Sequence, residues 1–308
     1  MSAPPTLRAS PGDWALLGLL GLIWGGSFLG VSVALGGIGP IWIAAGRIGL
    51  AAIALVAAML AMGHRLPGFS APVERRIWLH CVGMGLLSNA VPFTLLAWAQ
   101  QKVTTGFAGI TMAAVPLLVL PLAHFVVPGE RLTARRLVGF ATGFAGVLAL
   151  IGPAALWTAP GGEGDGLARL ACIAAAGCYA CGAVVTRLSP PVDQVRFATA
   201  AMLVAAAAIL PVALLAEALP AAPGGPALLA LAYLGLMPTA LATLILVRIV
   251  QRAGPSFLTL VNYQVPVWSV ILGVVFLSER LPPQFVLALG LILAGLAISR
   301  APAWRRRP

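Results

Sequence analysis

Long apolar runs, separated by short polar breaks, make up most of this 308-residue chain. A helix that crosses a membrane needs about 20 mostly apolar residues. The breaks contain Gly, Pro or charge, as in Gly63-His64-Arg65 and Pro160-Gly161-Gly162-Glu163. The pattern therefore predicts ten membrane-spanning helices, with gaps too short for a water-soluble domain. The predicted spans are 14–34, 41–62, 77–98, 105–127, 134–152, 167–187, 195–216, 227–249, 256–277 and 283–300.

Composition identifies the bilayer as the solvent for most of the chain. Hydrophobic residues make up 60% of it and charged residues 9%, whereas a soluble domain carries about 25% charged residues. The net charge of +11 would suggest nucleic acid in a soluble protein. Here the basic residues lie between apolar runs, so we predict an all-α integral membrane protein with no nucleic-acid partner. The expected partners are membrane lipid and a small-molecule substrate, and the expected state is a monomer or weak dimer.

The distribution of basic residues predicts the orientation of the chain. With a cytoplasmic N-terminus, 15 of the 19 Lys and Arg residues fall on the cytoplasmic side. Only Arg47, Lys102, Arg169 and Arg280 fall outside. Cytoplasmic loops carry an excess of Lys and Arg in membrane proteins. We therefore expect a multi-pass protein of the bacterial inner (plasma) membrane with both termini in the cytoplasm.

A tripeptide occurs twice, half a chain apart. Glu130-Arg131-Leu132 recurs as Glu279-Arg280-Leu281, and each copy ends an apolar segment that contains a proline, Pro116 or Pro266. The match in register indicates duplication, which predicts one repeat over residues 1–153 and a second over 154–308. Because each repeat holds five predicted spans, an odd number, the second must enter the membrane with opposite polarity. Two inverted five-helix repeats around a central cavity are typical of secondary transporters.

Two short sequence elements resemble those of a known family. Trp24-Gly25-Gly26-Ser27-Phe28 in the first span and the Pro…Glu-Arg-Leu ending of each repeat are similar to the EamA family of the drug/metabolite transporter superfamily. The second repeat departs from the pattern, since Cys178-Tyr179-Ala180-Cys181 stands where a Trp-containing element is expected. The resemblance covers nearly the whole chain. It implies ten helices, a central cavity and export of amino acids or other small metabolites, and it is strongest to the YddG-type aromatic amino acid exporters.

The ninth span has the most polar centre. Asn262, Tyr263 and Gln264 come just before Pro266, and Trp268 follows. Gln264 and Trp268 are four residues apart and share one helix face. An amide beside an aromatic ring suits an aromatic zwitterion, because the amide can hydrogen-bond its charged groups and the ring can stack on it. We predict that this segment contributes most to substrate binding.

Four further residues lie near the middle of other spans. They are Trp24, Asn89, Thr111 and Tyr179. Structural roles remain open for two of them, since Trp24 could fill space beside a glycine packing face and Asn89 could satisfy carbonyls freed by a proline. The predicted substrate-binding residues are Trp24, Asn89, Thr111, Tyr179, Asn262, Tyr263, Gln264 and Trp268.

Prolines and one histidine are the candidates for gating and coupling. Kinks at Pro92, Pro116, Pro238 and Pro266 are expected to help the two halves open the cavity to each side. His80, near the cytoplasmic end of the third span, is a candidate for proton coupling or gating, or a hydrogen-bonded packing residue.

Charge is scarce at the predicted membrane centre. No Asp, Glu, Lys or Arg falls at the middle of any predicted span. We therefore expect a nearly neutral cavity, which suits zwitterions better than phosphates, and export down a concentration gradient. Glu130 and Glu279, at helix ends, are assigned to structure or gating rather than to substrate contact.

No set of residues predicts catalysis, a cofactor or a metal. Cys81, Cys172, Cys178 and Cys181 all lie in apolar runs, where cysteine packs as a small hydrophobe. A lipid-modifying enzyme would need His with Asp, Glu or Ser at a membrane interface, which we do not find. The predicted function is a secondary transporter that exports small zwitterionic metabolites, aromatic amino acids first, by alternating access. Export of other small solutes or drugs, or a lipid-carrier flippase of the same fold, remain alternatives.

Overall fold

The computed structural model describes residues 9–127, 133–151 and 165–300, and all regular secondary structure in these ranges is helical. In chain order the elements are α1 (Pro11–Ala34), α2 (Pro40–Ala61), α3 (Pro72–Gly85), the π-helix η1 (Leu86–Ala90), α4 (Val91–Ala99), α5 (Thr105–Met112), α6 (Val115–Val126), α7 (Ala134–Ile151), α9 (Asp165–Arg187), α10 (Gln194–Ala216), α11 (Gly225–Gly235), the π-helix η2 (Leu236–Leu241), α12 (Ala242–Ala253), α13 (Pro255–Leu258), α14 (Val261–Leu277) and α15 (Pro283–Arg300). The predicted repeat boundary at 153/154 lies outside the described residues.

Helices occupy each range that the sequence predicts as a span, with ends shifted by a few residues. Proline sets several starts, because Pro11, Pro40, Pro72 and Pro283 open their helices. At that position the missing N–H would have no partner inside the helix, and the fixed φ already suits it.

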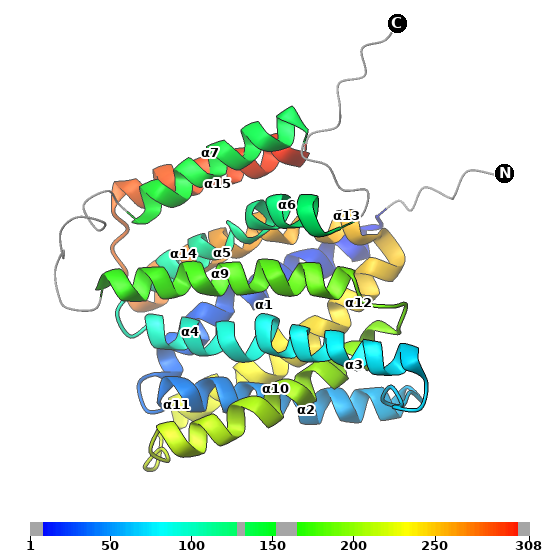
Figure 1. Ribbon diagram of the computed structural model, residues 1–308. Coiled ribbons are helices and arrows are strands. Elements are labelled where there is room, and N and C mark those ends of the chain that lie inside the picture. The colour runs from blue at the N-terminus through cyan, green and yellow to red at the C-terminus, as the bar shows by residue number, and fades with distance from the viewer. Residues whose placement is uncertain (1–8, 128–132, 152–164, 301–308) are drawn as a thin grey trace, which may run out of the picture.

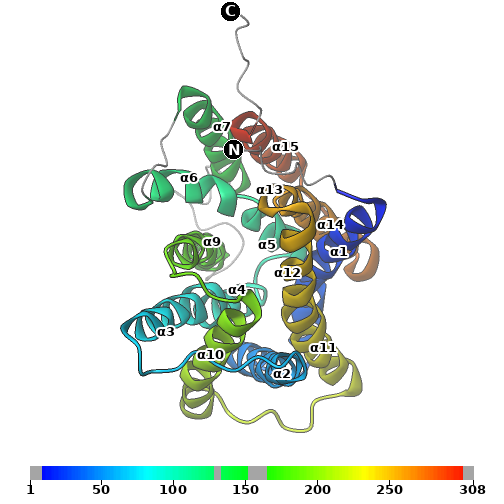
Figure 2. The same cartoon turned by 90° about the vertical axis from the view of Figure 1, so that its right-hand side faces the viewer.

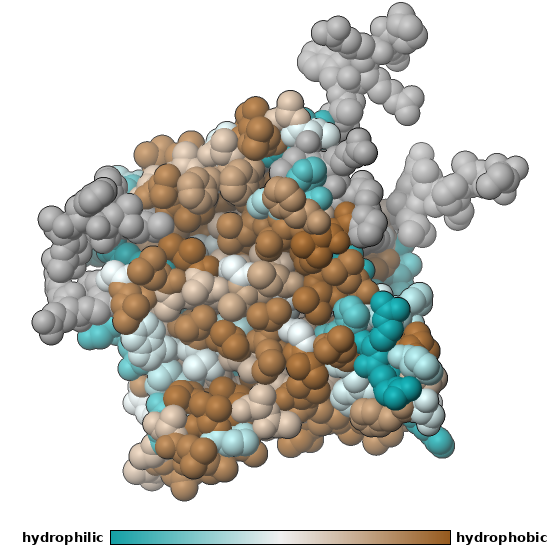
Figure 3. Space-filling model, viewed as in Figure 1, coloured by the Kyte–Doolittle hydropathy of each residue, from teal (hydrophilic) through white to brown (hydrophobic). Residues whose placement is uncertain are grey.

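Within the described residues, seven helical segments are long and apolar enough to cross a membrane, and two shorter ones, Val261–Leu277 and Pro283–Ser299, are also apolar. Large apolar side chains face outward, including Leu215, which is 90% exposed, and Phe125, which is 81% exposed. Figure 3 shows hydrophobic residues over much of the middle of one face. Such a surface is suited to lipid rather than water.

Several helices lie roughly along a common axis, and two of them, α2 and α9, are seen almost end-on in Figure 2. The start of α1 and the end of α15 lie at the same end of the bundle (Figure 1). We call this the α1-start end, and we call the opposite end, where α14 finishes, the α14 end. Helix α1 packs against α14, α11, α12 and α5, whereas α7 packs mainly against α15.

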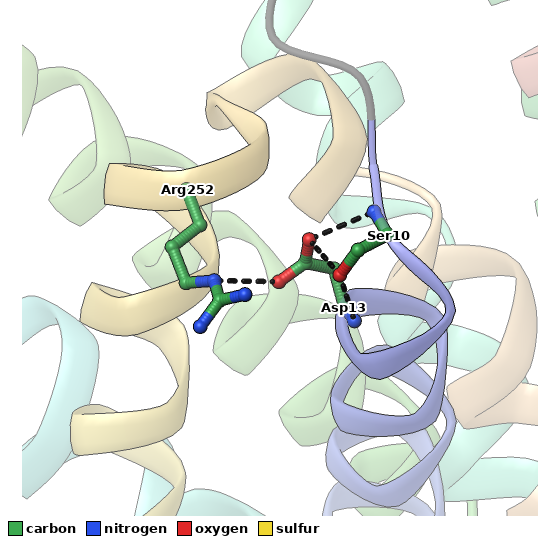
Figure 4. A network of polar contacts seen from close by, with 3 residues as sticks. All are labelled: Ser10, Asp13 and Arg252. Atoms are coloured by element: carbon green, nitrogen blue, oxygen red, sulfur yellow. Dashed lines mark hydrogen bonds and ion pairs between the residues drawn. The ribbon is translucent and has the colours of Figure 1, made fainter.

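A polar cluster joins two helices at the α1-start end. The hydroxyl of Ser10 accepts from the backbone N–H of Asp13 at 3.3 Å, and the Asp13 carboxylate accepts from the backbone N–H of Ser10 at 2.9 Å. The other carboxylate oxygen of Asp13 lies 3.1 Å from Nε of Arg252 (Figure 4). This capping box satisfies free amides of the first turn of α1, and the ion pair connects α1 to α12.

Close contact between α7 and α15 yields a stability prediction. A Cβ at Gly139 would lie 2.6 Å from the carbonyl oxygen of Gly295 and 2.7 Å from the backbone nitrogen of Ser299. Overpacking of this kind costs about 1–3 kcal/mol. We expect Gly139→Ala to lower the unfolding temperature of the detergent-purified protein.

Gly290→Ala on α15 is the matched control, because no atom lies within 4 Å of the added Cβ. Alanine there should leave the unfolding temperature unchanged or raise it, since it favours helix by about 0.5–1 kcal/mol over glycine. Equal losses in the two variants would contradict the packing described here.

Candidate functional site

A cavity of about 440 Å³ lies inside the bundle and is lined by residues from both halves of the chain. This volume is within the range of small-molecule sites. The described lining residues are Trp24, Ser27, Phe28, Arg47, Met84, Ser88, Asn89, Phe93, Leu96, Met112, Ala113, Val115, Tyr179, Ala183, Ala198, Met202, Pro238, Thr239, Thr243, Leu246, Asn262, Val265 and Pro266.

Both π-helices contribute to the cavity wall. Ser88 and Asn89 come from η1, and Pro238 and Thr239 come from η2. After η1 the backbone N–H of Val91 bonds to the carbonyl of Leu86, five residues earlier. Single π-turns within α-helices often occur at functional sites. Each half of the chain therefore presents one irregular, polar turn to the same space.

Trp24 lines the cavity, whereas Gly25, the next residue, packs against α14. The indole Nε1 of Trp24 donates to the carbonyl of Pro238 at 3.1 Å. A Cβ at Gly25 would collide with Trp268 on α14. The glycine packing face is therefore present at Gly25, and Trp24 lines the cavity rather than filling space beside that face.

Tyr179 on α9 lines the cavity in the second half of the chain. Its ring centroid lies 6.5 Å from that of Phe93, with the planes tilted by 59°. Tyr179 stands near the start of the second half much as Trp24 stands near the start of the first. The Cys178 and Cys181 side chains beside it are only half-buried, and no group of three metal-ligating side chains occurs among the described residues.

Arg47 is the one charged residue among the described residues that line the cavity. It is 8% exposed, and its Nε donates to the hydroxyl of Thr239 at 2.9 Å. Its guanidinium carbon lies 3.7 Å from the ring centroid of Phe93. Our prediction of a nearly neutral cavity was therefore wrong. The charge count places Arg47 on the outer side, close to the start of the predicted span 41–62.

The ninth span divides its polar residues between two environments. Asn262 lines the cavity, and its Nδ2 donates to the carbonyl of Thr259 at 3.1 Å. Gln264 instead packs on α1, where a Cβ at Gly21 would lie 2.5 Å from its Oε1. Trp268 fills the space beside Gly25 in the same way. These two predicted binding residues share a helix face, as expected, but that face meets α1.

The remaining predicted residues lie as follows. Tyr263 is half-buried and is not part of the lining. Thr111 is 1% exposed, and its hydroxyl donates to the carbonyl of Phe107 within α5. His80 also lies outside the lining, with Nδ1 2.7 Å from the carbonyl oxygen of Arg76.

The four prolines differ in their relation to the cavity. Pro238 and Pro266 line it, whereas Pro92 and Pro116 do not. Pro92 follows η1 as the second residue of α4, and Pro116 is the second residue of α6, after the break at Ala113–Ala114. Pro238 lies inside η2, and Pro266 lies inside α14. Three of the four thus stand at interruptions of a helix.

A partly buried hydrogen-bonded seam connects helices at the α14 end. The Glu279 carboxylate accepts from the backbone N–H groups of Thr105 at 2.6 Å and Gly106 at 3.0 Å, so it caps α5. The hydroxyls of Thr105 and Ser32 are 3.0 Å apart. Nε2 of Gln100 donates to the Ser32 hydroxyl at 3.1 Å. This seam joins α14 to α5 and α1, while Glu130, in the other copy of the motif, lies outside the described residues.

Glu217 makes the same kind of cap for α2. Its carboxylate accepts from the backbone N–H groups of Ile41 at 3.0 Å and Trp42 at 2.9 Å. Carboxylates at helix N-termini satisfy free amides and interact favourably with the helix dipole. Two acidic residues from the second half of the chain therefore cap helices in the first half.

Comparison with known proteins identifies the family. The model of the EamA-like transporter family matches residues 13–152 and again residues 164–301. This chain belongs to the EamA-like transporter family. The prediction of an EamA transporter in the drug/metabolite transporter superfamily is thus confirmed, and the family consists of transporters rather than enzymes.

Individual relatives of this EamA-like transporter cover nearly its full length. It is 30% identical over 281 residues to the uncharacterized inner membrane transporter YedA of Escherichia coli strain K12, covering 90% of this chain and 87% of YedA. It is 28% identical over 321 residues to the probable terminal-alkyne amino-acid exporter of Streptantibioticus cattleyicolor, covering 98% and 97% of the two chains. The fold also matches that of a crystal structure with a TM-score of 0.68 and 24% sequence identity. The match covers 95% of this chain and 98% of the chain in that crystal structure.

Loss of the Glu279 charge should destabilise the cap of α5. Glu279→Gln removes the negative charge of the carboxylate to which two backbone N–H groups of α5 donate. Hydrogen bonds to charged groups contribute about 1.5–3 kcal/mol. We therefore expect a lower unfolding temperature in a thermal melt of the purified protein. Arg280→Gln changes the exposed neighbouring side chain and should have little effect. Equal stability of the Glu279 variant and the wild type would show that the cap is not needed.

Proposed function

We propose that this transporter exports amino acids, with aromatic ones the expected substrates, from the cytoplasm across the bacterial inner membrane. The cavity carries the proposal, because it combines aromatic rings from both halves with amide groups and one arginine. Rings such as Trp24 and Tyr179 suit an apolar or aromatic side chain, and the polar groups suit the charged ends of a zwitterion. The name of the Streptantibioticus relative, an amino-acid exporter, supports the same substrate class.

We further propose ten membrane helices in two inverted five-helix repeats, residues 1–153 and 154–308, with a substrate site of the YddG type between them. The twofold family match supports the duplication. So does the position of η1 and η2, each within the third long helical run of its half. The start of α3 and the end of α9 lie at the α1-start end (Figure 1), and these helix ends carry the exposed Arg75, Arg76 and Arg187. These basic residues support cytoplasmic termini.

Alternating access is the mechanism that this arrangement favours. On α9, α10 and α14 the cavity-lining residues lie in the halves nearer the α1-start end, whereas on α1 and α12 they lie in the halves farther from it. The α14 end is joined by the seam of Gln100, Ser32, Thr105 and Glu279. From this seam we infer a state closed toward the outside, and we propose that rocking of one repeat against the other exchanges the closed end.

Counterflow in proteoliposomes tests the proposed function. Vesicles loaded with unlabelled phenylalanine or tryptophan should accumulate the labelled amino acid, and protein-free vesicles should not. Exchange of other amino acids but not of aromatic ones would contradict the aromatic preference. Exchange of no amino acid, with transport of other solutes or of labelled lipid, would favour the alternative functions.

Asn262 and Gln264 offer a matched pair of variants. Asn262→Ala removes an amide from the cavity, so KM should rise about 3- to 10-fold, as for the loss of a neutral hydrogen bond. Gln264→Ala removes an amide that packs on Gly21, so KM should stay near the wild-type value while the unfolding temperature falls. A larger KM effect in the Gln264 variant would place the substrate on the other face of α14.

A further inference from the structure

Arg47 carries a buried positive charge. Of the described residues that line the cavity, none is acidic. The one hydrogen bond that the described residues give the Arg47 side chain is from Nε to Thr239. A buried cation is costly unless an anion or several acceptors compensate it. The site is therefore built to be completed by a group that comes from outside.

The surroundings of Arg47 limit where that group can bind. Nε is occupied by Thr239, whose hydroxyl in turn donates to the carbonyl of Leu234 at 2.8 Å. The ring of Phe93 covers one face of the guanidinium. The two terminal Nη groups remain, and their paired N–H donors match a carboxylate in a two-point geometry.

The other lining residues favour a ligand that carries one negative charge next to an apolar group. Phe93, which stacks on Arg47, also lies beside Tyr179. Trp24 is held by the carbonyl of Pro238, one residue before Thr239. A ligand bound to the Nη groups would thus extend from the cation along aromatic rings. One arginine balances one carboxylate, whereas a phosphate group would leave excess charge in an otherwise uncharged cavity.

We propose that Arg47 binds the carboxylate of the transported solute and is the residue that selects carboxylate-bearing substrates. This inference rests on the proposed function and specifies its recognition chemistry. Thr239 and Phe93 are positioning residues, because they fix the guanidinium through Nε and through one face. The cost of the buried charge is offset when a carboxylate binds, so an analogue that lacks the carboxylate should bind poorly.

Ligand binding to the purified full-length protein tests the proposal. The probes are L-phenylalanine, L-phenylalaninamide, which lacks the negative charge, and hydrocinnamate, which lacks the ammonium group. Wild-type protein should bind L-phenylalanine roughly 10- to 100-fold more tightly than the amide, the range expected for a charge-assisted hydrogen bond. Hydrocinnamate should compete with L-phenylalanine. Equal affinity of wild-type protein for L-phenylalanine and its amide would overturn the proposal, whatever the variants do.

Arg47→Gln should remove the difference between L-phenylalanine and its amide while keeping affinity for the amide, which shows that the variant is folded. Arg47→Lys keeps the charge but not the two-point geometry and should retain part of the difference. Arg75→Gln, at an exposed position of α3, removes one positive charge elsewhere and should change neither affinity. A variant in which both ligands weaken equally would assign Arg47 a structural role and overturn the proposal.

The outcomes separate this inference from the proposed function. Amino acid counterflow that Arg47→Gln leaves unchanged would reject the carboxylate site and keep the exporter. Binding of hydrocinnamate that depends on Arg47, without exchange of any amino acid, would keep the carboxylate site and reject amino acid export.

Discussion

A helix inside a membrane can be interrupted only where other groups take over the hydrogen bonds of the freed backbone, and the cavity of this protein follows from that constraint. Helical runs are interrupted at η1 and η2, and again at Ala113–Ala114 and Thr259–Leu260. Polar side chains satisfy carbonyls at three of these places: Asn89 bonds to Met84, Thr239 to Leu234 and Asn262 to Thr259. All three side chains also line the cavity.

The roles considered for such residues, substrate contact and backbone support, therefore do not exclude one another. An amide has more hydrogen-bonding groups than one carbonyl occupies, so Asn89 and Asn262 can support the chain and still face a solute. Neutral groups already engaged in this way contribute modest affinity. A charged side chain discriminates more strongly between ligands of different charge. Among the described lining residues, Arg47 is the one that carries charge.

The location of the helices could be predicted from the sequence, because apolar length and proline positions determine it. The face that each helix turns toward the cavity could not. Helix α14 is apolar on all sides apart from its polar first turns, so its own pattern does not indicate an orientation. The partner helix decides it: Gly21 and Gly25 on α1 leave grooves that Gln264 and Trp268 fill, which turns Asn262 toward the cavity. Arg47 was detectable, because an ionisable residue within an apolar span indicates function by default. Because Arg47 is counted with the charges that flank the spans, its place in the cavity is not predicted.

The hydrogen bonds around η2 connect ligand recognition to the relation between the halves. Arg47 and Trp24 belong to the first matched half, and each bonds to a residue of η2 in the second, Thr239 and Pro238. Arg47 and Trp24 both line the same cavity. If one half moves against the other, either these two bonds break or η2 moves with the first half. In the first case the guanidinium loses the contact that fixes its orientation, and in the second the cavity wall changes shape. Either outcome would alter the affinity for the carboxylate that we propose Arg47 binds, and a carrier needs such a change in order to bind a solute on one side and release it on the other.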